Sequence, residues 1–70
     1  MTLPIVLQSD PDVDLLHTLE LETTDDGAEV LVVDRAEDCC GARTVYAHWP
    51  IEALPRIAEA LMRRWRESLA

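Results

Sequence analysis

Residues 13–33 read VDLLHTLELETTDDGAEVLVV, and this stretch decides the fold. In its first half, up to Thr23, apolar and polar side chains largely alternate, which is typical of a β-strand with one solvent-exposed face. The DDG triplet at 25–27 lies between two apolar runs and indicates a hairpin, because glycine tolerates positive φ. Four consecutive apolar residues, 30–33, leave neither face of a strand polar. They predict a central strand that is covered on both sides.

The flanking segments extend this pattern into a meander. Residues 35–42, RAEDCCGA, combine acids, small residues and a glycine, and predict a loop. Alternation resumes over 43–49, RTVYAHW, and predicts another strand. Pro4 excludes residues 1–11 from the middle of a sheet, so this segment is expected to form an N-terminal arm or an edge strand. We therefore predict a single domain over 1–70 with a β-meander over 12–49.

Residues 51–69 predict an amphipathic helix, because their apolar residues recur at i, i+3, i+4 and i+7. Proline lacks an amide hydrogen, so the regular helix should begin at about Leu54 with Pro55 in its first turn. The expected fold is α+β, a three-stranded or possible four-stranded antiparallel meander with one C-terminal helix packed on one face. The core stripe of this helix is predicted to be Leu54, Ile57, Leu61 and Trp65.

One helix covers only one face of such a sheet, and the central strand offers apolar side chains to both. The second face needs a cover, either the N-terminal arm or another chain, and we expect a homodimer. Adjacent strand residues face opposite ways, so Tyr46 and Trp49 cannot both point at the helix. The predicted apolar interface comprises Leu16, Leu31, Val33, Tyr46 and Trp49.

Charge divides the chain into two parts. The 14 acidic residues outnumber six basic ones, all of them arginine, for a net charge of -8. The first 42 residues hold eleven of the acids against Arg35 alone, whereas residues 43–70 hold five arginines and three glutamates. Such a field repels nucleic acid and anionic membranes and attracts basic protein surfaces, although acidity also keeps a small domain soluble. The predicted acidic partner-binding residues are Glu20, Glu22, Asp25, Asp26 and Glu29.

Several classes of function are disfavoured. The chain has no long apolar run and no signal-peptide pattern at its start, so a cytoplasmic protein without membrane contact is expected. His17 and His48 lack an evident nucleophile or acid partner, so we predict a non-enzymatic protein without a cofactor. Strands followed by a helix occur in single-strand nucleic-acid binders, but Glu20 and Glu22 lie where basic and aromatic residues would be needed, which argues against direct nucleic-acid binding.

Three functional hypotheses remain, in this order. The first is a small acidic inhibitor-like or adaptor-like protein that occupies a basic surface of a protein partner, with nucleic-acid mimicry as one form. The second is a homodimeric docking module that uses the uncovered apolar sheet face. The third is a metal or redox module on Cys39, Cys40 and His48. No metal site is predicted, because neighbouring cysteines rarely bind one ion together and the spacing matches no CxxC pattern. A redox switch is disfavoured because no basic residue adjoins the thiols to lower their pKa.

Overall fold

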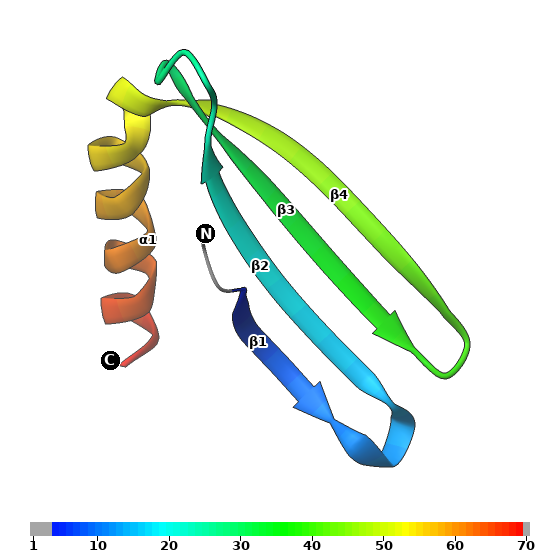
Figure 1. Ribbon diagram of the computed structural model, residues 1–70. Helices are drawn as coiled ribbons and strands as arrows, with labels where there is room; N and C mark the ends of the chain where they lie inside the picture. Colours follow the sequence, from blue (N-terminus) through cyan, green and yellow to red (C-terminus); the bar gives the residue numbers. More distant parts are fainter. Residues whose placement is uncertain (1–3, 70) are drawn as a thin grey trace.

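The computed structural model describes residues 4–69 as one antiparallel sheet followed by one helix (Figure 1). Spatial order equals chain order, β1-β2-β3-β4, so the sheet is a meander. This confirms the α+β class in its four-stranded form, with the N-terminal segment as an edge strand. The elements are β1 (Ile5–Asp10), a 3-10 turn η1 (Pro11–Val13), β2 (Leu15–Thr23), β3 (Glu29–Asp38), β4 (Gly41–Pro50), a 3-10 turn η2 (Ile51–Ala53) and α1 (Leu54–Ser68).

The two faces of the sheet follow from the register, because directly opposite residues point to the same side. Val32 lies opposite Leu21 and Ala47, and we call this side face A. Val33 lies opposite Glu20 and Tyr46 on the other side, face B. The buried hydrophobic residues of the described chain are Val30, Val32 and Val33, all on β3. The prediction of a central strand with apolar groups on both sides is confirmed.

The turn between β2 and β3 is held by its own side chains. Gly27 has φ 71°, and its amide donates to the carbonyl of Thr24 at 2.9 Å. The Asp26 carboxylate accepts from the Ala28 amide at 3.0 Å and from the Thr24 hydroxyl at 2.7 Å. These hydrogen bonds, first that of Ala28, hold the pKa of Asp26 below its ordinary value. The expected hairpin is confirmed.

The loop predicted over 35–42 is wrong, because only two residues of it leave the sheet. β3 continues to Asp38 and β4 begins at Gly41, so Cys39 and Cys40 alone connect the strands. The Asp38 carboxylate accepts from the amides of Cys40 at 2.8 Å and Gly41 at 3.1 Å. A side chain that bonds to the backbone two and three residues on favours a tight turn, and this replaces the flexible connection that the composition indicated.

The start of the meander also differs from the prediction. β2 begins at Leu15, and Pro11–Val13 form η1 instead of extended chain. The Asp10 carboxylate caps η1 by accepting from the Asp12 amide at 3.0 Å, and Asp14 adopts φ 55°. Within β1, Leu7 is an extra residue, because Val6 pairs with Thr18 whereas Gln8 pairs with His17. This bulge twists the edge strand locally.

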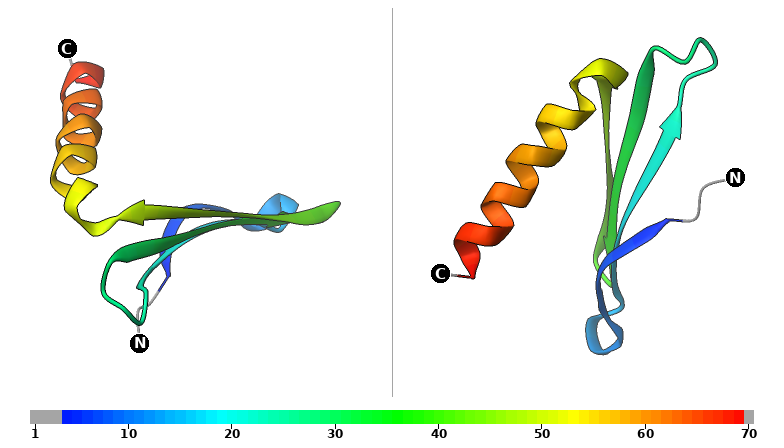
Figure 2. Two further views of the ribbon diagram at one scale, coloured as in Figure 1. Left: turned by 90° about the horizontal axis from the view of Figure 1, so that it is seen from above. Right: turned by 90° about the vertical axis from the view of Figure 1, so that its left-hand side faces the viewer.

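Helix α1 begins at Leu54 with Pro55 in its first turn, as predicted, but its packing is limited. Leu54 and Ile57 are half-buried, whereas Leu61 and Trp65 are 62% and 56% exposed. Figure 2 shows why: α1 starts at the end of β4 and diverges from the sheet toward its C-terminus. Its main contacts are with η2. The expected packing of the whole stripe on a sheet face is therefore corrected to contact by the first turns alone.

Within residues 4–69, no helix has the length and apolar character needed to cross a membrane.

Candidate functional site

Three of the predicted acidic residues lie on one face at one end of the sheet. Glu20 and Glu22 project from β2 and Glu29 from β3, all on face B, as the register requires. Among residues 4–69, none of these three carboxylates forms an ion pair. Their charges are therefore open to an external cation. We call Glu20, Glu22 and Glu29 the acidic row.

A shallow hollow adjoins the acidic row where β2 runs into its turn. It measures about 340 Å³. Leu31 supplies an apolar surface, and the carboxyl-bearing residues Glu22 and Asp25 line the same hollow. Thr23 and Thr24 complete the lining. This combination suits a long basic side chain, whose methylene stem needs apolar contact and whose head needs negative charge.

Asp25 and Asp26 are neighbours in sequence but differ in role. Asp26 holds the turn through its bonds to Thr24 and Ala28, and its charge is already engaged locally. Asp25 is exposed, lines the hollow, and makes no side-chain hydrogen bond within the described part of the chain. The structure thus brings Asp25 to the acidic row and gives Asp26 a structural function.

The predicted apolar interface residues are divided between the two faces. Leu16, Leu31, Val33 and Tyr46 lie on face B, whereas Trp49 pairs with Val30 on face A. Val33 is buried and Leu31 is half-buried, so neither offers a broad contact surface. Tyr46 is 63% exposed beside Val33, and Leu16 is 37% exposed farther along face B, so these two present apolar surface to solvent.

His17 and Asp34 form a contact that the sequence reasoning missed. The Nε2 atom of His17 lies 2.5 Å from a carboxylate oxygen of Asp34, with both side chains on face A. They stand on a diagonal, because His17 is opposite Ala36 and Asp34 is opposite Leu19. The pair places polar groups in the middle of face A, between the apolar neighbours Leu19 and Val45. Alternation alone put His17 on that face, but its partner depends on the hairpin register.

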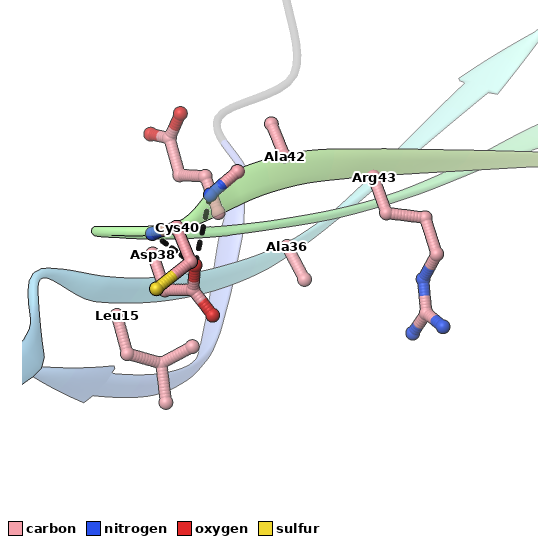
Figure 3. A pocket seen from close by; sticks show the side chains of 8 residues that line it. Leu15, Ala36, Asp38, Cys40, Ala42 and Arg43 are labelled. Carbon is pink, nitrogen blue, oxygen red and sulfur yellow. Dashed lines mark hydrogen bonds between the residues drawn. The ribbon is translucent and has the colours of Figure 1, made fainter.

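The cysteines lie at the far end of the β3–β4 hairpin and face solvent. Their sulfur atoms are 3.5 Å apart, both thiols are free, and Asp38 completes a cluster of three potential ligands. Cys40 and Asp38 also line a shallow pocket with Leu15, Ala36 and Arg43 (Figure 3). His48 stands eight residues along β4 from Cys40, about 26 Å for an extended strand. The structure does not bring His48 to the thiols.

The electrostatic setting of the thiols is also unfavourable to redox or metal chemistry. The hydrogen bond with Cys40, together with the nearby charge of Asp38, raises the pKa of the Cys39 thiol. The thiolate is the nucleophile and the metal ligand, so a raised pKa lowers the reactive fraction at neutral pH.

Comparisons with protein-family models, with curated proteins and with solved structures find no match to this chain.

Proposed function

We propose that this protein is a small acidic, non-enzymatic interaction protein that presses the acidic row against a basic surface of a protein partner, in the manner of an inhibitor or adaptor. The observation that carries the proposal is the hollow beside the row, with Leu31 as its apolar surface and carboxylates at Glu22 and Asp25. An arginine or lysine of the partner fits this combination of groups. The acidic row supplies further contacts along the same face.

Electrostatics supports this arrangement beyond the single hollow. The chain carries a net charge of -8, and the five arginines of residues 43–70 lie outside β2, β3 and the turn that joins them. Arg35 is the arginine that face B carries, opposite Thr18 and Thr44 and beyond the Glu20 end of the acidic row. A predominantly acidic surface speeds encounter with a basic partner and disfavours acidic ones. Free, exposed thiols are typical of proteins in a reducing compartment, which supports a cytoplasmic function as part of this proposal.

Imitation of a nucleic acid is one form of this function, and charge spacing limits how close the imitation is. Glu20 and Glu22 are two residues apart on one strand, about 7 Å. A nucleic-acid strand carries one charge per ~3.4 Å of its axis. The row is therefore sparser than a phosphate backbone. If this protein occupies the nucleic-acid-binding surface of its partner, added nucleic acid should displace it. If it binds a separate basic surface, the partner should bind this protein and nucleic acid at the same time.

The test measures how binding to the partner depends on salt, for the wild type and for two double variants that each lose two charges. The partner is first captured by chemical cross-linking from cell extract and then purified. Calorimetry gives the dissociation constant of the complex at each salt concentration. Glu20→Gln with Glu22→Gln should weaken binding about 2- to 30-fold, because each rim ion pair is worth ~0.2–1 kcal/mol. The salt dependence of binding should also become shallower.

The matched control neutralises two acids outside face B. Glu52→Gln with Glu67→Gln changes the net charge equally but leaves the acidic row intact, since these residues belong to η2 and α1. Equal weakening by the two double variants would show that only total charge matters. Binding that does not respond to salt would overturn the proposal.

A docking function of face B, with Tyr46 as its exposed apolar contact, is the second candidate. Tyr46→Ala should then weaken the complex more than the loss of both glutamates does, with little dependence on salt.

A further inference from the structure

The C-terminal half of α1 exposes a continuous apolar surface. Leu61, Met62 and Trp65 are 62%, 46% and 56% exposed, and their spacing puts them on one side of the helix. We call these three residues the α1 stripe. Helices with such a stripe obtain most of their stability by burying it against something else. The sheet of the same chain does not do this, because α1 diverges from it (Figure 2).

Face A is left open over much of its length. Val30 and Val32 are buried near the end where α1 begins, which is consistent with shielding by the first turns of the helix. Farther along the face, the apolar residues Ile5 and Val45 remain 49% and 50% exposed. Val45 lies opposite Asp34. One chain therefore carries two uncovered apolar surfaces, a helix stripe and a sheet face.

The size of the uncovered surface can be estimated. The chain exposes 5763 Å², whereas a compact protein of its mass exposes about 4,400 Å². Its radius of gyration is 14.5 Å, against about 11 Å for a compact chain of this length. Each chain thus exposes about 1,350 Å² more than a folded monomer should.

We propose that a second copy of this chain covers both surfaces, with the α1 stripe of each copy packed on face A of the other. Two copies that each cover the excess surface bury about 2,700 Å² in total, which lies within the ~2,000–5,000 Å² of obligate homodimers. The arrangement is reciprocal, so one two-fold axis satisfies both surfaces at once and the assembly closes at two chains.

Charge complementarity favours this occupant. α1 carries four arginines and two glutamates, whereas face A carries the carboxylates of Asp10, Asp34 and Asp38 against one arginine, Arg43. Arg64 and Arg66 flank the α1 stripe on its two sides, since each stands one residue from Trp65, about 100° around the helix in opposite directions. A positive rim around an apolar stripe matches an apolar face that carries acidic side chains.

The dimer is independent of the proposed function, because it uses face A and leaves face B outside. It also goes beyond that function, since each assembly would display two acidic rows.

The first test is molar mass in solution, by sedimentation equilibrium over a wide concentration series. The wild type should have twice the chain mass of 7.9 kDa. Leu61→Arg should raise the dissociation constant of the dimer roughly 30-fold or more, as expected for a central interface residue. Ala60→Arg is the matched control: it adds the same charge one residue away, about 100° around the helix from Leu61 and outside the α1 stripe, and should leave the dimer intact.

A second pair of variants tests face A and guards against a helix variant that fails to fold. Val45→Glu should dissociate the dimer, whereas Thr44→Glu on the same strand points to face B and should not. Far-UV circular dichroism of each variant reports whether the sheet persists.

Mixing the two dissociated variants tests whether the contact runs between chains. A heterodimer of Val45→Glu and Leu61→Arg has one unaltered contact and one that joins opposite charges. It should form when the variants are mixed, although each alone is monomeric. A wild-type monomer at all concentrations, a Leu61→Arg dimer of wild-type strength, or a mixture that stays monomeric would each overturn the proposal. None of these results bears on binding of a basic partner at face B.

Discussion

Truncation of Val32 to alanine tests whether the core is as small as the structure shows. Val32 is 6% exposed and lies between Leu21 and Ala47 on face A. The change removes two carbons from a buried side chain, which costs about 1.6 kcal/mol in transfer free energy at ~0.8 kcal/mol each. Incomplete collapse of the cavity raises the loss of unfolding free energy to about 2 kcal/mol. The total free energy of unfolding of a chain of this length is about 3.5–10 kcal/mol.

The control is the same truncation at an exposed site. Val6 is 58% exposed on β1 and points to face B, so Val6→Ala should cost at most ~0.7 kcal/mol by the same arithmetic. Urea unfolding followed by circular dichroism measures both variants at one protein concentration, since association adds to apparent stability. The melting temperature of Val32→Ala should fall by about 8–16 °C. Equal losses at Val32 and Val6 would refute the assignment of β3 as the core.

Three further outcomes follow from the turns. Asp26→Asn should lower the urea midpoint at neutral pH, whereas Asp25→Asn should not. The pKa of Asp26 is depressed on folding, so its charge stabilises the fold at pH values above 3.8, the pKa of the group in the unfolded chain. The difference in stability between wild type and variant should vanish as the pH falls through the lower pKa of the folded state. Asp38→Ala should lower the free energy of unfolding by about 1 kcal/mol, because it removes the acceptor for the amides of Cys40 and Gly41. Chemical unfolding measures this loss, and a variant as stable as the wild type would contradict the role given to Asp38. Cys40→Ala removes the hydrogen bond that raises the pKa of Cys39, so Cys39 should be alkylated at lower pH, as followed by mass spectrometry; an unchanged pH profile would contradict that cause.

Local patterns predicted most of the fold because local chemistry determines those elements. Alternation up to Thr23, the apolar run over 30–33 and the DDG triplet fix two strands and their hairpin. Pro55 fixes the start of the helix. The same patterns failed over 35–42, where side chains on both faces are largely exposed. A strand without a buried side shows no alternation of apolar and polar residues, so its sequence resembles that of a loop.

The site required information that a pattern does not contain. Because side chains alternate along a strand, the sequence predicts that Glu20 and Glu22 share a face. Placing Glu29 on the same face requires the register of the hairpin. The diagonal contact between His17 and Asp34 depends on the same register. For α1, periodicity shows which side of the helix needs cover. It does not show what provides that cover, because the direction in which the helix leaves β4 depends on the conformation of η2.

The bulge at Leu7 has a consequence for aggregation. Fibrils grow only if each molecule offers two regular, unpaired strand edges, one to accept a neighbour and one to extend. Here β1 is interrupted between Val6 and Gln8 and is preceded by Pro4, which cannot donate a backbone hydrogen bond. β4 is regular from Gly41 to Pro50. With one competent edge, strand addition would stop at a single pairing, so this long sheet is protected from open-ended polymerisation.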